Sequence, residues 1–131
     1  MEIKKEKTRR IFIQINRLPP SLNVLIRMHW RARGELQKAF DAQVFAAWIK
    51  ARKIVFTVPV NLVYVLGFTA QHRRDIDNYI GGTKLITDSL KRTFLFRDDS
   101  EWVKSIQVRF IKNDIEETVV MIEEALGKCA P

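Results

Sequence analysis

The sequence is poor in cysteine, histidine and glycine, and each shortage excludes a class of site. Cys129 is the only cysteine among 131 residues, so neither a disulfide within the chain nor a thiolate metal cluster is possible. The two histidines are far apart, and no serine or cysteine nucleophile has a matching histidine. Five glycines form no phosphate-binding loop, because Gly81-Gly82 lacks the flanking pattern.

Long hydrophobic runs are also missing. No apolar run approaches the roughly 18 residues that a membrane-spanning helix needs. Residues 1–7 lack the apolar core of a signal peptide. These absences predict a cytoplasmic protein with no membrane partner.

Basic residues, by contrast, are plentiful. The chain has 23 Lys and Arg against 15 Asp and Glu, which gives a net charge of +8. Such an excess favours a polyanionic partner, because it raises encounter rates and non-specific affinity. The length predicts a single domain over residues 1–131, with residues 1–8 and 124–131 frayed.

The spacing of apolar residues predicts a mixed α/β domain. Strands are expected at residues 11–15, 57–69, 102–112 and 118–122, and helices at residues 30–53 and 83–93. A loop is expected from residue 21 to about residue 28, and the strand at 57–69 is apolar enough for burial on both faces. The predicted fold class is therefore α/β, a single domain in which two main helices pack on a mixed sheet of about four strands.

Five carboxylates are concentrated between residues 73 and 99, among lysines and arginines. They are Asp75, Asp77, Asp88, Asp98 and Asp99. On an extended backbone Asp75 and Asp77 share one face, roughly 7 Å apart, which suits a shared divalent cation. The alternative is that Asp75 and Asp77 cap a helix, that Asp98-Asp99-Ser100 forms a turn, and that the other charges are solvated.

A second cluster is basic and surrounds the start of the predicted long helix. It contains Arg27, His29, Arg31 and Arg33, with Trp30 among them. Such a cluster suits phosphate binding, with the indole stacking on an exposed base. The alternative is a solvated helix start whose Trp30 packs inward.

The acidic motif resembles that of the RusA family of Holliday junction resolvases, which are crossover junction endodeoxyribonucleases. The matching segments are Arg74-Asp75-Ile76-Asp77-Asn78, Lys84 four residues before Asp88-Ser89-Leu90, the Asp98-Asp99 pair, and an early loop, Pro19-Pro20-Ser21-x-Asn23. Together they cover most of the chain.

The resemblance implies a fold, a reaction and a set of site residues. Asp75, Asp77 and Asp99 would bind Mg²⁺ as the catalytic carboxylates, and Lys84 would be the catalytic lysine. Asp88 would either orient Lys84 or form an ordinary ion pair with it. A homodimer would cut four-way DNA junctions by two symmetric phosphodiester hydrolyses. The arginines expected to face DNA are Arg9, Arg10, Arg27, Arg31, Arg33, Arg73 and Arg74.

The chain departs from the family pattern in the gap between Asp77 and Lys84, which is longer by about one helical turn. On one unbroken helix Lys84 would lie roughly 10 Å along the axis from Asp77. Gly81-Gly82 would allow the backbone to fold back, with Thr83 capping the next helix. Two alternatives stay open: a catalytically inactive branched-DNA-binding protein of the same fold, and a magnesium enzyme acting on small phosphorylated substrates.

Overall fold

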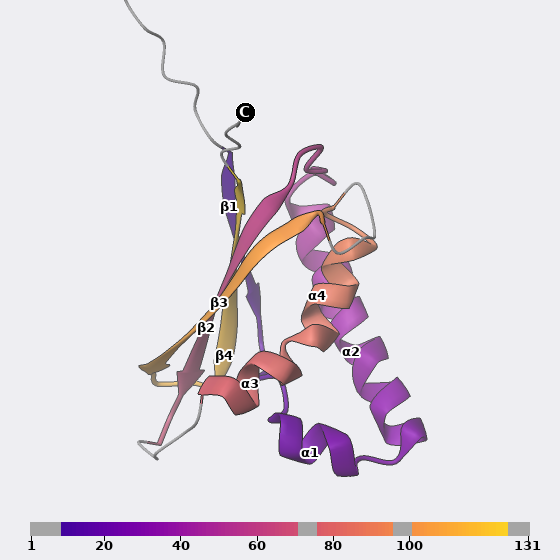
Figure 1. Cartoon of the computed structure of the whole chain (residues 1–131), viewed down its shortest axis with the longest axis vertical. Helices are drawn as coiled ribbons and strands as arrows, with labels where there is room; N and C mark the ends of the chain where they lie inside the picture. Colours follow the sequence, from indigo (N-terminus) through magenta and orange to yellow (C-terminus); the bar gives the residue numbers. More distant parts are fainter. Residues whose placement is uncertain (1–8, 71–75, 96–100, 126–131) are drawn as a thin grey trace, which may run out of the picture.

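The computed structural model describes residues 9–70, 76–95 and 101–125, which form a four-stranded sheet with four helices. The elements in chain order are β1 (Arg10–Ile15), α1 (Leu22–Arg27), α2 (Trp30–Lys50), β2 (Val60–Phe68), α3 (Ile76–Gly82), α4 (Lys84–Lys91), β3 (Val103–Lys112) and β4 (Glu117–Glu124). The strand order is β1-β4-β2-β3, in which only the β2–β3 pair is parallel. The helices cover one face of the sheet (Figure 1), which confirms the predicted fold class.

The sheet buries one side of β2 more deeply than the other, although apolar residues lie on both sides of this strand. In β2 the side chains of Val60, Leu62, Tyr64 and Leu66 are fully buried, whereas the residues between them are partly exposed. The expectation that this strand is buried on both faces was therefore wrong, because the helices cover only one of them. That covered face holds most of the apolar burial that stabilises the domain.

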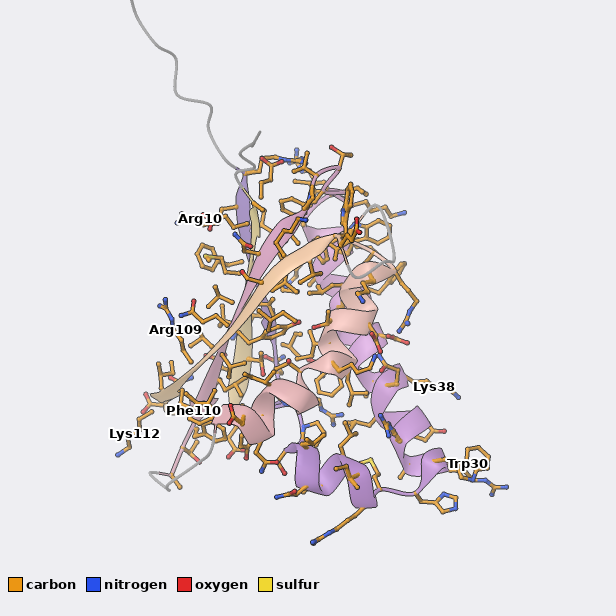
Figure 2. The ribbon with its side chains drawn as sticks, in the orientation of Figure 1. Arg10, Trp30, Lys38, Arg109, Phe110 and Lys112 are labelled. Atoms are coloured by element: carbon orange, nitrogen blue, oxygen red, sulfur yellow. The ribbon has the colours of Figure 1, made fainter. Side chains whose placement is uncertain are left out.

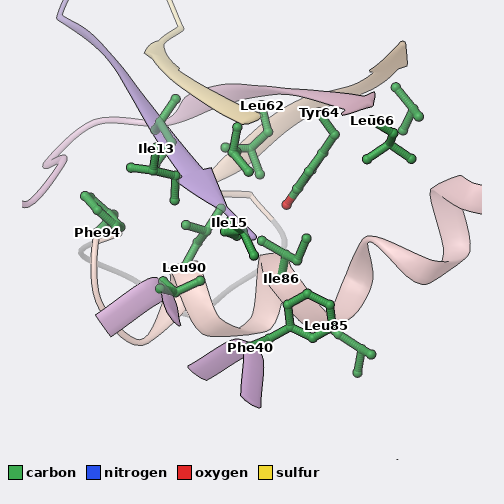
Figure 3. Close-up of a cluster of buried hydrophobic side chains, with 14 of the residues drawn as sticks. Ile13, Ile15, Phe40, Leu62, Tyr64, Leu66, Leu85, Ile86, Leu90 and Phe94 are labelled. Carbon is green, nitrogen blue, oxygen red and sulfur yellow. The ribbon is translucent and has the colours of Figure 1, made fainter. Parts of the chain in front are cut away.

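The core lies between the sheet and helices α2 and α4. Phe40 of α2 and Ile86 and Leu90 of α4 are fully buried, and they face Leu62 and Tyr64 of the sheet (Figure 3). Residues at helical spacing lie on one side of a helix, which is how Phe40 and Val44 of α2 and Leu85, Ile86 and Leu90 of α4 come to be buried.

A polar clamp joins α2 to α4 beside this core. Asp41 of α2 accepts hydrogen bonds from Ser89, Gln37 and Arg92. Burial tends to raise the pKa of Asp41, but these three hydrogen bonds outweigh it, and the pKa lies below its ordinary value. The carboxylate therefore stays charged and holds the two helices together.

Helix α1 replaces the predicted loop. Ser21 caps it by accepting a hydrogen bond from the Val24 N–H at 3.3 Å, and the helix ends at Arg27. Leu25 is its only buried residue, and the helix has six residues, too few for apolar spacing to identify it from the sequence.

The helix expected over residues 30–53 ends earlier, at Lys50. Arg52 and Lys53 have φ angles of 60° and 55°, a left-handed conformation that does not continue a helix. Strand β4 runs further than expected, to Glu124, and Glu123 and Glu124 form ion pairs with Arg10 and Arg9 of the β1 segment. Residues 123 and 124 are thus part of the sheet, whereas residues 126–131 lie outside the described residues.

Candidate functional site

Helix α3 carries the first described carboxylate of the acidic motif. Asp77 is exposed and lies in the first turn of α3, where the helix dipole favours a negative charge. The extended geometry expected around this residue is therefore wrong for Asp77, and a place at a helix start, the alternative, is what the structure shows. Tyr79 anchors α3 by packing its ring edge-on against Phe68 and Phe110, each at 5.5 Å between centroids.

Helix α1 packs directly on α3, and the contact joins two distant parts of the motif. The Asn23 N–H donates a hydrogen bond to Asn78 Oδ1 at 3.1 Å. A Cβ on Gly82 would lie 1.7 Å from the Pro20 carbonyl oxygen, and one on Gly81 would lie 2.9 Å from the Leu22 side chain. Both glycines therefore permit close packing between the segments.

The predicted fold-back at Gly81-Gly82 does not occur. No glycine among the described residues has a positive φ, and both glycines belong to α3. Thr83 makes no side-chain cap; its hydroxyl donates instead to the Ile80 carbonyl at 2.7 Å. The chain changes direction at Thr83, and α4 begins at Lys84 as expected (Figure 1).

Asp77 and Lys84 therefore lie at opposite ends of α3. Seven residues at 1.5 Å per residue correspond to about 10 Å along the helix. The Lys84 ammonium lies 3.3 Å from a carboxylate oxygen of Asp88, one turn further along α4. With side chains 66% and 32% exposed, this pair is a surface ion pair of small energetic value.

A shallow pocket of about 300 Å³ lies beside this ion pair. Helices α3 and α4 and strand β3 line it with Ile80, Gly81, Thr83, Lys84, Thr87, Asp88, Lys91 and Ile106. Lys84 and Lys91 are two turns apart on α4, so both ammonium groups lie on one side of the helix. Because Asp88 also lines the pocket and pairs with Lys84, Lys91 supplies the net positive charge that the pocket offers to an anionic group.

The basic cluster lies on the surface where α1 leads into α2. Trp30 is 71% exposed and projects away from the core (Figure 2). The Arg31 guanidinium lies 5.1 Å from the centroid of its ring, and the His29 ring stacks on it at 5.6 Å. The alternative in which Trp30 packs inward is therefore wrong.

His29 also fixes the start of α2. Its Nδ1 accepts a hydrogen bond from the Arg31 N–H at 3.1 Å, so the imidazole is the N-cap of the helix. No acidic residue lies in the first turn of α2, whereas exposed arginines do. Arg27 is exposed in the last turn of α1 and belongs to the same surface segment. This end of the molecule is thus positively charged and suited to phosphate groups.

Two arginines expected to face DNA have protein partners instead. Arg9 pairs with Glu124 at 3.1 Å and Arg10 with Glu123 at 2.7 Å. Both pairs lie at the end of the sheet where β1 begins and β4 ends. Their positive charges are therefore already balanced.

Several candidate residues lie outside the described residues, namely Arg73, Arg74, Asp75, Asp98 and Asp99. The described neighbours of the two acidic segments nevertheless lie at opposite ends of β2. Tyr79 of α3 packs on Phe68, at the carboxyl end, whereas the Trp102 carbonyl accepts a hydrogen bond from the Val60 N–H, at the amino end. Eight strand steps of about 3.3 Å separate those ends by about 26 Å.

The described residues hold only part of a metal-binding set. Within residues 9–70, 76–95 and 101–125, no three His, Cys, Asp or Glu side chains gather as metal ligands would. Asp77 has the hard oxygen donors that Mg²⁺ prefers, whereas Asp88 is paired with Lys84. The fit of Mg²⁺ to this chain therefore depends on Asp75 and Asp99 joining Asp77.

The residues that join α1 to α3 were not recognised as a contact from the sequence. Asn78 and Gly82 belong to the acidic motif, but their partners, Asn23 and Pro20, belong to the early loop. Two adjacent glycines within a helical segment were the only signal of such close packing.

The comparisons with protein-family models and with curated proteins identify no relative. The chain matches no protein-family model, and a search of curated proteins finds no similar protein. No helix in the described part of the chain is both long and apolar enough to cross a membrane.

Proposed function

We propose that this protein is a magnesium-dependent, structure-specific endonuclease that cuts four-way DNA junctions by paired phosphodiester hydrolysis. The observation that supports it most is the contact of α1 with α3. That contact brings the early loop onto the Asp-x-Asp-Asn motif, about 55 residues away in sequence, through Asn23 and Asn78. The basic cluster begins with Arg27 in the last turn of α1, and Asp77 lies in the first turn of α3. The basic side chains and this carboxylate are therefore positioned by two helices that pack together.

The proposed roles follow from these positions. Arg27, Arg31 and Arg33 bind backbone phosphates at the start of α2, and Trp30 stacks on an unpaired base near the branch point. Arg73 and Arg74 are proposed to contact phosphates nearer the acidic motif.

Catalysis is proposed to depend on the three carboxylates Asp75, Asp77 and Asp99. A bound Mg²⁺ would supply stabilisation of the charge that develops on the attacking and leaving oxygens. Because α3 separates Lys84 from Asp77, we assign Lys84, together with Lys91, to a neighbouring phosphate in the pocket beside α4. Two copies of the chain would supply the two nicks.

The second candidate is an inactive protein of the same fold that binds branched DNA. Two observations favour it: Lys84 lies at the far end of α3 from Asp77, and the described neighbours of Asp99 lie at the other end of β2. Such a protein would keep the basic cluster and Trp30 and would bind junctions without cutting them.

The experiment uses a synthetic four-way junction in magnesium, with cleavage and gel shift measured on the same samples. We expect paired symmetric nicks by the wild type, and loss of nicking with retained binding in Asp77→Asn. Glu35→Gln is the control, because it removes one negative charge from an exposed side chain of α2 that has no proposed role. Binding without nicks by the wild type would favour the second candidate. Weak, salt-insensitive DNA binding would instead indicate a magnesium enzyme for small phosphorylated substrates.

A further inference from the structure

Strand β1 is an edge strand with one free side. The Glu124 N–H donates to the Arg9 carbonyl at 3.0 Å and the Thr118 hydroxyl donates to the Arg17 carbonyl, so odd-numbered residues of this segment face β4. The Asn16 N–H points the other way, to Gln43 Oε1 of α2 at 2.7 Å. Because strand residues alternate, the backbone groups of Arg10, Phe12 and Gln14 face away from β4. No strand of the described residues lies on that side.

The residue composition of the β1 edge is unusual for a strand edge that is exposed only to water. Exposed edges are normally protected by charges, proline or a covering element. Strand β3, the other edge, carries Lys104, Arg109 and Lys112, and α3 packs against it. In β1 the only charge is Arg10, which Glu123 neutralises, and the other residues are three isoleucines, a phenylalanine and a glutamine. The β1 edge is therefore suited to pairing with another strand.

There is room beside β1 for such a strand. A groove of about 480 Å³ runs between the free side of β1 and α2. Its lining residues are Phe12, Ile13, Gln14 and Asn16 of the strand segment and Gln43, Ala46, Ala47, Lys50 and Ala51 of the helix segment. Three alanines leave space on the helix side, while on the opposite face of the sheet Phe12 is 63% exposed. An added strand would cover apolar surface on both of its faces.

We propose that this edge pairs with the β1 edge of a second copy of the chain, so that two four-stranded sheets join into one. The choice of a second copy rests on the proposed function, which needs two nicks related by two-fold symmetry. It is also supported by local charge, because Arg10 pairs with Glu123 and Gln14 bonds Glu117. The charge of β1 itself is therefore balanced where two chains of net charge +8 approach at this edge, and Lys50 of α2 is the charged residue that remains in the groove.

The alternation of β1 limits the pairing to registers in which even-numbered residues lie opposite even-numbered residues, and we place the two-fold axis at Phe12, the exposed apolar residue of the strand. In an antiparallel pair, residues directly opposite each other share a face of the sheet. A two-fold axis at Phe12 places Phe12 opposite the second copy's Phe12, and Arg10 opposite the second copy's Gln14. By symmetry Gln14 lies opposite the second copy's Arg10, and all three pairs involve the backbone groups that face the free side, so each pair forms two hydrogen bonds. The two phenylalanine rings then form a cross-strand aromatic contact at the axis.

This register allows the dimer to be tested through its two-fold axis. Phe12→Asp places two carboxylates opposite each other at the axis and Phe12→Lys places two ammonium groups there, so each variant alone is expected to be monomeric. A 1:1 mixture is expected to form dimers again, because a carboxylate then faces an ammonium. Ile26→Asp is the matched control: its side chain is 67% exposed on α1, and this variant is expected to stay dimeric.

The measurement is sedimentation velocity of the full chain over a range of concentrations, without DNA or magnesium, with circular dichroism to check folding. A monomeric wild type, dimeric single variants or a mixture that stays monomeric would each overturn the proposal. If the Phe12 variants fail to fold, Gln14→Pro replaces them: it removes an N–H on the free side, which an edge strand tolerates, and the side-chain hydrogen bond to Glu117, so Gln14→Ala, which loses only the side-chain bond, is its control. We expect Gln14→Pro to weaken dimerisation at least about tenfold, since two hydrogen bonds are lost; an unchanged dimer would overturn the proposal.

The proposal and the proposed function can fail separately. Restored dimers in the mixture, together with a wild type that does not nick junctions, would retain the β1 interface and remove the endonuclease function. Paired nicking by a protein whose dimer is unaffected by both Phe12 variants would retain the function and place the interface elsewhere.

Discussion

Gly82→Ala tests whether the docking of α1 on α3 stabilises the protein. The added Cβ would lie 1.7 Å from the Pro20 carbonyl oxygen, whereas ordinary van der Waals contact begins at 3.4 Å, so the two segments would have to separate by about the difference between these distances. The obstacle is backbone rather than a flexible side chain, which puts the cost at the upper end of overpacking, about 3 kcal/mol. Alanine recovers about 1 kcal/mol through its higher helix propensity. The expected net loss is about 2 kcal/mol.

The chain offers a matched control in Gly34→Ala. Gly34 lies within α2, and a Cβ there would meet nothing within 4 Å. This substitution is expected to stabilise the protein by about 0.5 to 1 kcal/mol, because only helix propensity changes.

Urea denaturation of the wild type and both variants measures these differences. With a slope of about 1.5 kcal/mol per molar urea, the midpoint of Gly82→Ala should fall by about 1.3 M, whereas that of Gly34→Ala should rise slightly. A Gly82→Ala protein as stable as the wild type would refute the close α1–α3 packing, and with it the structural argument for the proposed function.

Two further predictions concern a buried hydroxyl and an exposed indole. Tyr64 is fully buried and its hydroxyl bonds Thr87 Oγ1 at 2.5 Å, so Tyr64→Phe should cost about 1 kcal/mol in the free energy of unfolding. Burial raises the pKa of the Tyr64 phenol above its ordinary value, so above pH 10 only the unfolded chain releases this proton. Stability should then fall by up to about 1.4 kcal/mol per pH unit above pH 10, and urea titrations of Tyr64→Phe should lack this contribution; an equal slope in both proteins would contradict the burial argument. Trp30→Ala should weaken junction binding about tenfold in a gel shift while changing the unfolding free energy by less than about 0.5 kcal/mol, and unchanged binding would exclude base stacking by Trp30.

The sequence by itself determined the elements whose apolar residues repeat regularly. The alternation in β1 and the stripes on α2 and α4 record which side of each element is buried, and burial is the main source of stability; the apolar run of β2 predicted a strand but not which of its sides is covered. Composition also indicated a polyanionic partner. The acidic and basic clusters were visible as residues, although not as an arrangement in space.

Only the tertiary structure decided how those clusters are placed. Helix α1 has six residues, too few for apolar spacing to identify it, and it becomes recognisable only when it packs on α3. Gly81-Gly82 was interpreted as a flexible point, but the glycines serve close contact with Pro20 and Leu22, a property of two segments that no local pattern records. The separation of Asp77 from Lys84 likewise depends on α3 forming as a helix. Which edge of the sheet stays open depends on strand order, and strand order is set by contacts between residues far apart in the chain.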